Sequence, residues 1–182
     1  GAEAVGGNEG DLKLITIKDD QNNVVEEKYY RYYKSGESNG FQHGIKMYFD
    51  GPSFARLKQA VSGWETADDS TVKPYATDYF EYDSQQRVTT RSTQGGGCSS
   101  MCDGIGTSIF EYTVSSNTDG YNSWKYKQVE KLPGYDTNDP YNTQNTSVTV
   151  YSNFAGQTML QITKQDATGT AWYEYTRYDD EG

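Results

Sequence analysis

The sequence predicts an all-β protein, built of antiparallel β-hairpins that form a meander or a curved sheet, with one short helix near residues 52–62. Three observations carry this prediction. The chain holds 17 Tyr, 6 Phe and 3 Trp but few aliphatic residues, and it has 19 Gly; tyrosine and the other aromatics favour strands, and glycine favours turns. A unit of strand, acidic or amide-rich turn and strand recurs along the chain. Only one stretch has a persuasive helical pattern.

The chain is expected to begin with a flexible lead at residues 1–10, and residues 11–182 are expected to form a single domain. The lead is made of small and polar residues, which cannot bury a core. The expected strands follow in pairs as antiparallel hairpins. They lie at 12–18 and 24–34, at 41–49, within a hairpin at 75–93, at 108–114 and 124–132, at 147–153 and 158–164, and at 170–178.

Three connections and one turn are expected between these strands. Asn39-Gly40 accepts the positive φ angles of a type I′ turn and would join 24–34 to 41–49. The connections are a polar segment at 65–74, a glycine-rich loop at 93–106 and a loop with two prolines at 133–145.

The helix is predicted from its cap and its apolar spacing. Asp50 can cap the first turn, which tolerates Pro52, and Gly63 offers a left-handed stop. One apolar stripe on so short a helix indicates that it packs across a sheet, and Trp64 is expected to join that contact. The stripe consists of Phe54, Leu57 and Val61.

The charge and hydropathy of the chain exclude two classes of partner. The formal net charge is −10, and no run of Lys and Arg is present, which argues against nucleic acid. No apolar stretch approaches the about 20 residues of a membrane-spanning helix. We expect the chain to be a segment of a longer protein, so that any targeting signal lies outside it.

A short turn motif recurs in the sequence. Its members are YDSQQR from Tyr82, YSNFAGQ from Tyr151, YDDEG from Tyr178 and, in a more degraded form, KDDQNNV from Lys18. An Asp or Asn side chain accepts backbone N–H groups in such a turn, a glycine supplies positive φ, and an arginine stem can lie across the next tyrosine ring. The motif residues build turns, and none of them is needed for a chemical reaction. They are Tyr82, Asp83 and Arg87; Tyr151, Asn153 and Gly156; and Tyr178, Asp179 and Gly182.

These stretches resemble the YD repeat of Rhs-type proteins, whose pattern is Tyr-Asp-x-x-Gly-Arg followed by an apolar strand. VVEEKYYRYYKSGE and CSSMCDGIG, with the SFARL helix between them, are similar to regions of large Rhs-repeat proteins of planctomycete-like bacteria. The chain departs from the pattern at two positions. It has Gln86 where the pattern has Gly, and Asn153 where the pattern has Asp. Gly182 precedes the expected arginine. The irregular spacing of the motif tyrosines implies an array interrupted by insertions.

Cys98 and Cys102 lie four positions apart in the glycine-rich loop. A local disulfide in an oxidising compartment is the favoured interpretation, beside a pair of free thiols and half of a metal site. A structural zinc needs four ligands, and His43 is the only histidine left to help. A redox pair normally has two intervening residues, whereas this pair has three.

Catalytic and metal chemistry find little support. His43 is interpreted as a partly exposed strand or turn residue, and no nucleophile motif is present. Three acidic stretches could ligate calcium, but ordinary turn chemistry explains them, so no metal or cofactor is expected. These stretches are Asp68-Asp69, 117–120 and 136–139.

The tryptophans permit a sharper hypothesis. Exposed rings at alternating strand positions could stack on sugar faces, and the candidates are Trp64, Trp124 and Trp172. Because aliphatic residues are so few, we favour the interpretation that these rings form the core itself.

The expected function is a non-catalytic structural β scaffold, a segment of a large Rhs-like protein that is secreted or attached to the cell surface. Its partners would be neighbouring repeats or domains of the same protein. Two alternatives stay open. One is a carbohydrate-binding or adhesive module that uses surface aromatics. The other is a self-assembling extracellular fibre subunit, in which unpaired edge strands recruit neighbouring copies.

Overall fold

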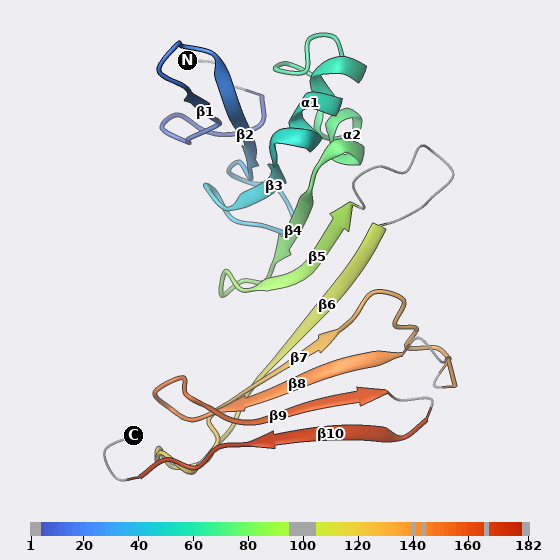
Figure 1. The fold of residues 1–182 in the computed structure, drawn as a ribbon. Coiled ribbons are helices and arrows are strands. Elements are labelled where there is room, and N and C mark those ends of the chain that lie inside the picture. Colours follow the sequence, from blue (N-terminus) through green and yellow to red (C-terminus); the bar gives the residue numbers. More distant parts are fainter. Residues whose placement is uncertain (1–4, 95–104, 140, 143–144, 166–167, 180–182) are drawn as a thin grey trace. The chain divides into compact units, whose positions relative to one another are not determined.

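The computed structural model describes residues 5–94, 105–139, 141–142, 145–165 and 168–179. Its ten strands follow one another in chain order as an open antiparallel meander, accompanied by short helices (Figure 1). The predicted all-β fold class is therefore confirmed. Every strand between the first and the last has its neighbours in sequence as its neighbours in the sheet, which is the arrangement that hairpins joined by short turns produce.

The strands and helices have the following bounds. The strands are β1 (Leu14–Lys18), β2 (Val24–Tyr32), β3 (Ile45–Phe49), β4 (Asp78–Tyr82), β5 (Val88–Gln94), β6 (Ile105–Val114), β7 (Tyr126–Lys131), β8 (Thr146–Ser152), β9 (Thr158–Gln165) and β10 (Thr170–Tyr175). The helical elements are α1 (Gly51–Ala60), α2 (Asp69–Val72) and the 3-10 turn η1 (Lys73–Tyr75).

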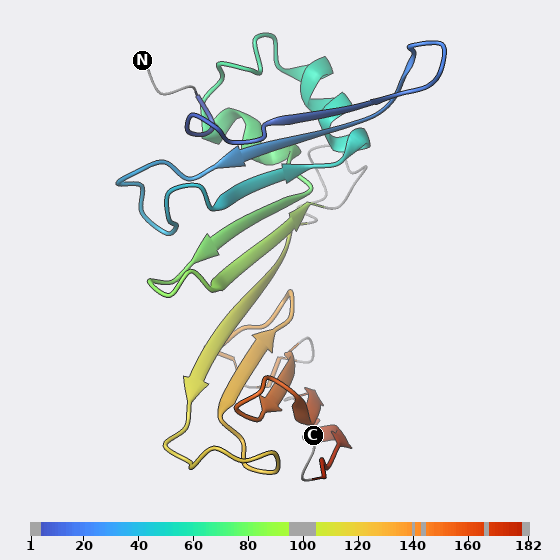
Figure 2. The same ribbon diagram turned by 90° about the vertical axis from the view of Figure 1, so that its left-hand side faces the viewer.

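The chain divides into two compact units, Gly1–Gly106 and Thr107–Gly182, whereas the sequence analysis placed residues 11–182 in one domain. The first unit holds β1 to β5 and all the helical elements. Its core forms where α1 packs on β2 and β3 (Figures 1 and 2). The buried core side chains are Tyr29, Met47, Phe49, Phe54, Leu57, Val72 and Ala76.

The helix α1 confirms the sequence prediction in its cap and its buried face. The side chain of Asp50 accepts a hydrogen bond from the Ser53 backbone N–H at 2.9 Å, and Phe54 and Leu57 are buried. The ring of Trp64 meets the Phe54 ring edge-on, with centroids 4.8 Å apart. An amphipathic helix this short is stabilised by such packing rather than by its own backbone bonds.

Two expectations for the first unit are wrong. The connection 65–74 was expected to be a polar segment without regular structure, but it contains the helix α2. Asp68 caps this helix by accepting a hydrogen bond from the Thr71 N–H. The strand expected at 41–49 begins only at Ile45, so residues 33–44 connect β2 and β3, a longer connection than the 35–40 expected around Asn39-Gly40. Gly40 serves a different need there, since a Cβ at that position would lie 2.3 Å from the ring of Tyr33.

Part of the segment expected as a flexible lead is packed against the first unit. Gly6, Gly7 and Asn8 are buried. The Asn8 side chain donates to the Tyr33 carbonyl at 3.0 Å, and the Tyr32 N–H donates to the Gly6 carbonyl at 3.0 Å. The glycines allow this because a side chain at Gly6 would collide with the stem of Arg31.

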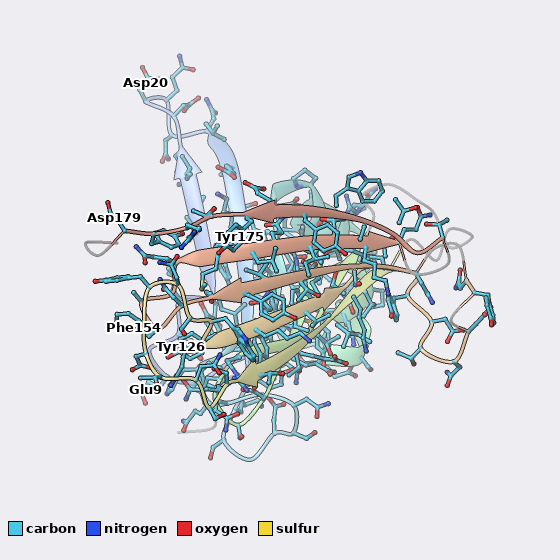
Figure 3. The ribbon with its side chains drawn as sticks, turned by 90° about the horizontal axis from the view of Figure 1, so that it is seen from below. Glu9, Asp20, Tyr126, Phe154, Tyr175 and Asp179 are labelled. Carbon is cyan, nitrogen blue, oxygen red and sulfur yellow. The ribbon has the colours of Figure 1, made fainter. Side chains whose placement is uncertain are left out.

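The second unit is a sheet without a helix among its described residues. Strands β7, β8, β9 and β10 pair in order, and β6 pairs with β7 (Figure 3). Few side chains in this unit are fully buried, and several aromatic ones are exposed. A single layer of strands can cover its side chains only with their neighbours in the same layer, which explains this exposure.

Candidate functional site

Three hairpin tips of the sheet are built by one hydrogen-bond pattern. In each, the first residue of the tip, an Asp or an Asn, accepts through one side-chain oxygen from the backbone N–H groups two and four positions later. These first residues are Asp19 (from Gln21 and Asn23), Asp83 (from Gln85 and Arg87) and Asn153 (from Ala155 and Gln157). The backbone N–H of the first residue also donates to the carbonyl four positions on. The recurring motif is thus one repeated local structure.

The fourth residue of each tip adopts the left-handed conformation. The φ angles are 67° at Asn22, 63° at Gln86 and 81° at Gly156. Each tip is accompanied by a register shift in its hairpin, located between the last two positions of the first strand. A turn followed by a left-handed residue and a bulge is a common three-residue hairpin connection. The sequence pattern has Gly at this left-handed position. Two of the three tips have a larger residue there, Asn22 and Gln86.

Arg87 pairs with the aspartate of its own tip. Its Nε donates to Asp83 Oδ2 at 2.7 Å, and its Nη2 lies 2.6 Å from the same oxygen. Desolvation opposes ionisation of Asp83, but the hydrogen bonds from Arg87 and Gln85 outweigh it and lower the pKa of the carboxyl. The expectation that the arginine stem lies across the next tyrosine ring stays a prediction. The Asp–Arg pair shows why an arginine suits this position beside an aspartate.

Asn153 departs from the motif because its amide nitrogen is used. Its Nδ2 donates to the Tyr121 carbonyl at 3.1 Å and to Gln157 Oε1 at 2.7 Å, and its side chain is fully buried. A carboxylate has no donor and would place negative charge beside these two oxygens. An asparagine therefore satisfies both the turn and the loop that packs over it.

The motif tyrosines fasten strands to their neighbours. The Tyr82 hydroxyl donates to the Ile45 carbonyl at 2.8 Å, and the Tyr178 hydroxyl donates to the Thr158 carbonyl at 2.7 Å. The ring of Tyr151 contacts Trp124 edge-on at 5.4 Å between centroids. These contacts are typical of partly buried tyrosines, whose ring covers a neighbouring segment while the hydroxyl forms a hydrogen bond.

The last described motif residues are held by a loop. The Tyr178 N–H donates to Asn122 Oδ1 at 3.0 Å, and Asn122 Nδ2 donates to the Tyr178 carbonyl at 2.7 Å. The strand expected at 170–178 ends at Tyr175, and residues 176–179 have no regular secondary structure. Asp179 follows this anchored position. Gly182, Cys98 and Cys102 lie outside the described residues.

The three tryptophans proposed for sugar stacking lie in different environments. Trp64 belongs to the packing around the core of the first unit, where its ring meets Tyr29 edge-on at 5.0 Å. Trp124 is partly covered by Tyr151. Trp172 is 57% exposed on β10, beside Tyr173 at 70% and Tyr175 at 61% (Figure 3 labels Tyr175). The structure does not bring the three tryptophans together. Because side chains alternate along a strand, Trp172 lies on one face of β10, and the exposed Tyr173 and Tyr175 lie on the other.

A buried arginine organises the first unit. Arg31 has no exposed surface, and it donates to the Ala67 and Trp64 carbonyls and to Asp69 Oδ1, each at 2.8 Å. Lys46 lies 2.7 Å from the other Asp69 oxygen. Desolvation opposes ionisation of Asp69, but these two cations lower its pKa. The sequence contains one signal for the burial of Arg31. Residues two apart on a strand share a face of the sheet, so Arg31 lies on the same face of β2 as Tyr29.

His43 forms an ion-pair geometry with the N-terminal segment. Its Nδ1 lies 2.8 Å from Asp11 Oδ1, and the Asp11 side chain is nearly buried while that of His43 is half exposed. Asp11 also accepts from the Asn8 backbone and side chain at 2.7 and 2.9 Å. The pair fixes the segment onto the connection that precedes β3. His43 holds a left-handed φ of 70°, so it is a turn residue.

The acidic stretches considered for calcium are engaged in turns and ion pairs. The Asp136 side chain accepts from the Asn138 N–H, and Asp139 accepts from the Tyr141 N–H. Within the described residues, no group of three or more His, Cys, Asp or Glu side chains is arranged to hold a metal ion. No helix in the described part of the chain is both long and apolar enough to span a bilayer.

No protein-family model, no curated protein and no solved structure matches this chain. The repeated tip and the exposed residues of β10 are therefore the features of this chain that bear on its function.

Proposed function

We propose that this chain is a non-catalytic structural scaffold, a β segment of a large Rhs-like protein that is secreted or attached to the cell surface. The observation that supports it is the repeated hairpin tip, which occurs at Asp19, Asp83 and Asn153 with the same set of backbone hydrogen bonds. A chain that repeats one turn can lengthen a sheet unit by unit. Its natural partners are neighbouring repeats or domains.

The motif side chains support this proposal because their polar atoms bind their own hairpins or the segments packed beside them. Asp83 accepts from two backbone N–H groups and from Arg87, and the Tyr82 hydroxyl donates to a neighbouring strand. A catalytic carboxylate needs access to a substrate proton and a pKa matched to the task. The lowered pKa of Asp83 and its hydrogen bonds fit a structural role instead.

Exchange of the tips tests the proposal. Replacement of residues 83–87 by the sequence of residues 153–157 keeps the turn pattern, so we expect an unchanged fold and a Tm within a few degrees of wild type. A matched replacement by Ser-Gly-Ser-Gly-Ser should lower the Tm, because it lacks the Asx acceptor. Thermal unfolding and hydrogen exchange of β4 and β5 measure both. A tip exchange that preserves the fold but abolishes a binding or enzymatic activity of the parent would overturn the scaffold role.

The exposed rings of β10 favour carbohydrate binding as a second candidate. Trp172 stays available for stacking on a sugar face, whereas Trp64 and Trp124 are packed against other rings. A neutral glycan suits a protein with a net charge of −10, which repels acidic polymers. We expect any glycan-array signal to disappear in Trp172→Ala and to persist in Trp124→Phe. A signal unaffected by Trp172→Ala would exclude this candidate site.

A further inference from the structure

Strand β10 has one edge that pairs with none of the other described strands. It ends the strand order, and its pairing with β9 is regular over six positions, from Thr170 to Tyr175, without a bulge. Proteins commonly protect an edge with lysine, proline or a bulge, and Thr170–Tyr175 contains neither residue. The pairing of β1 with β2 is likewise regular from Leu14 to Ile17 and shifts register only at Ile17/Lys18. Among the described strands, β10 is therefore an edge that is open to strand addition.

The hydrogen-bond phase of β10 determines which backbone groups point outward. The Thr176 N–H donates to the Met159 carbonyl at 2.8 Å, and Tyr175 lies opposite Leu160. Because hydrogen-bonded and non-bonded pairs alternate in an antiparallel ladder, Thr170, Trp172 and Glu174 bond toward β9. The N–H and C=O groups of Ala171, Tyr173 and Tyr175 then face away from the sheet.

The same reasoning applies to β1, the strand at the other end of the order. The Tyr30 N–H donates to the Lys13 carbonyl at 2.8 Å, and Leu14 lies opposite Tyr29. Lys13, Ile15 and Ile17 therefore bond toward β2. The backbone groups of Leu14 and Thr16 face outward, and the Leu14 side chain is exposed.

We propose that the β10 edge binds β1 of a second copy of this chain, antiparallel, with Lys13 opposite Glu174. This register joins outward-facing backbone groups on both strands, in the pairs Leu14–Tyr173 and Thr16–Ala171. It also brings exposed Leu12 and Leu14 beside exposed Tyr175 and Tyr173. The two nearest registers with the same hydrogen-bond phase form no such ion pair. One places Asp11 opposite Glu174, so that two carboxylates face each other, and the other places Ile15 opposite Glu174.

The charge near Lys13 favours a carboxylate as its partner. Lys13 Nζ donates to the Val5 carbonyl at 2.8 Å. Desolvation and the nearby charges of Arg31 and Lys34 lower the pKa of Lys13, whereas Asp11 raises it, and an incoming Glu174 would add a second carboxylate that favours the charged amine. Pairing of two β10 strands centred on Tyr173 would instead place each Glu174 opposite a Trp172, so it would form no ion pair. We therefore propose a head-to-tail contact, in which each copy keeps one free β10 edge or β1 edge for a further copy.

This inference rests on the proposed scaffold role, for which it names a partner. The scaffold role and the strand addition can be disproved separately. A protein that stays monomeric would overturn the strand addition and leave the tip exchange unaffected. Two copies, each with net charge −10, repel at long range. We expect association to strengthen as NaCl rises from about 0.01 M to about 0.15 M, because the Debye length falls from about 30 to about 8 Å.

Sedimentation velocity over a concentration series of the full chain, in reducing buffer with about 0.15 M NaCl, tests the contact. Wild type should give a ladder of species. Glu174→Lys and Lys13→Glu should each associate at least about ten-fold more weakly, because like charges then face each other. An equimolar mixture of the two variants should recover association, since each contact in an alternating series again joins opposite charges.

Two further variants keep the test decisive. Lys18→Glu makes the same charge change on β1 outside the proposed pairs and should associate like wild type. Tyr173→Pro removes an outward N–H that β9 does not use, so it should block association while the far-UV circular dichroism is preserved. A wild-type monomer at every concentration, a series that stops at a dimer, or a mixture that stays monomeric would overturn the proposal.

Discussion

At the scale of single residues, two positions of the repeated tip show how the same turn tolerates different side chains. Gln86 and Gly156 occupy the same left-handed position, with φ of 63° and 81°. A Cβ is unfavourable in this region by about 1 kcal/mol or more, whereas glycine adopts it freely. Gln86 is exposed and therefore contributes little packing in return.

We expect Gln86→Gly to raise the free energy of unfolding by about 1 kcal/mol, because the strain at this position disappears. Urea denaturation followed by circular dichroism measures the change. The reverse substitution at the equivalent tip, Gly156→Gln, should lower stability by a similar amount. Equal effects of one sign at both positions would show that the left-handed conformation is not what matters.

Asn153 gives the second residue-scale prediction. In Asn153→Asp the two donors to the Tyr121 carbonyl and to Gln157 are lost, and a fully buried carboxylate faces oxygens. We expect a loss of about 2 kcal/mol, since unsatisfied buried groups cost about 1–3 kcal/mol each. Chemical denaturation at pH 7 measures it, and the loss should shrink at a pH where the new carboxyl is protonated. A neutral Asn153→Asp would contradict the role of the amide.

At the scale of elements, Arg31 is what joins α2 and the segment before it to the sheet. It reaches from β2 to two carbonyls and to Asp69 at the start of α2. The isolated α2 has only four residues, too few to be stable without tertiary contacts. The stability of this element therefore depends on a side chain that lies 38 positions away in sequence.

We expect Arg31→Met to cost about 3–5 kcal/mol, because it leaves Asp69 without its buried partner and two carbonyls without donors. Hydrogen exchange should show α2 losing protection before β4 and β5 do. Arg91→Met is the matched control. Arg91 pairs with Asp78 at 2.8 Å but is itself half exposed, and Asp78 would keep the Thr93 hydroxyl as a donor, so we expect a smaller loss. Equal losses in both variants would contradict the role of burial.

At the scale of the whole molecule, acid stability follows from carboxylates with lowered pKa values. Asp50 and Asp68 cap helices, Asp69 pairs with two cations, and Asp19 and Asp83 accept in hairpin tips. For each of these groups the folded pKa lies below the unfolded one. Their stabilisation is fully present above the unfolded value of about 3.9 and is lost as pH falls through the folded values.

We therefore expect the free energy of unfolding to decline as pH falls below about 5, and to keep declining through the lower folded pKa values. Denaturant unfolding between about pH 2 and 7 measures this slope. Asp69→Asn should be less stable at pH 7 and should show a shallower decline, because one of the linked protons is removed. An identical slope in Asp69→Asn would show that Asp69 does not contribute.

The alkaline side has the opposite sign. Burial raises the pKa of Tyr33 well above its usual range, and its hydroxyl donates to the Phe80 carbonyl at 2.7 Å. A group whose folded pKa is raised contributes stability below the unfolded value, and this contribution is lost as pH rises past about 10. Tyr33→Phe should weaken the decline above about pH 10, measured by the same unfolding series.

The sequence by itself determined the antiparallel meander, the helix α1 and the position of each repeated tip. These features depend on local rules: alternation, the Asp50 cap, and an Asp or Asn side chain that bonds to N–H groups within four positions. Contacts between residues close in sequence can be read from short patterns. This is why the tips at 83–87 and 153–157 were placed correctly.

The tertiary structure alone decided which residues are covered. It placed Arg31 in a buried cluster with α2, packed Asn8 against Tyr33, gave the Asn153 amide a partner 32 positions away, and left Trp172 exposed while Trp64 was packed. The physical reason is that burial and pairing depend on strands and loops distant in sequence. A tyrosine-rich alternating strand looks the same whether a neighbour covers it, as at Tyr29, or does not, as at Tyr173.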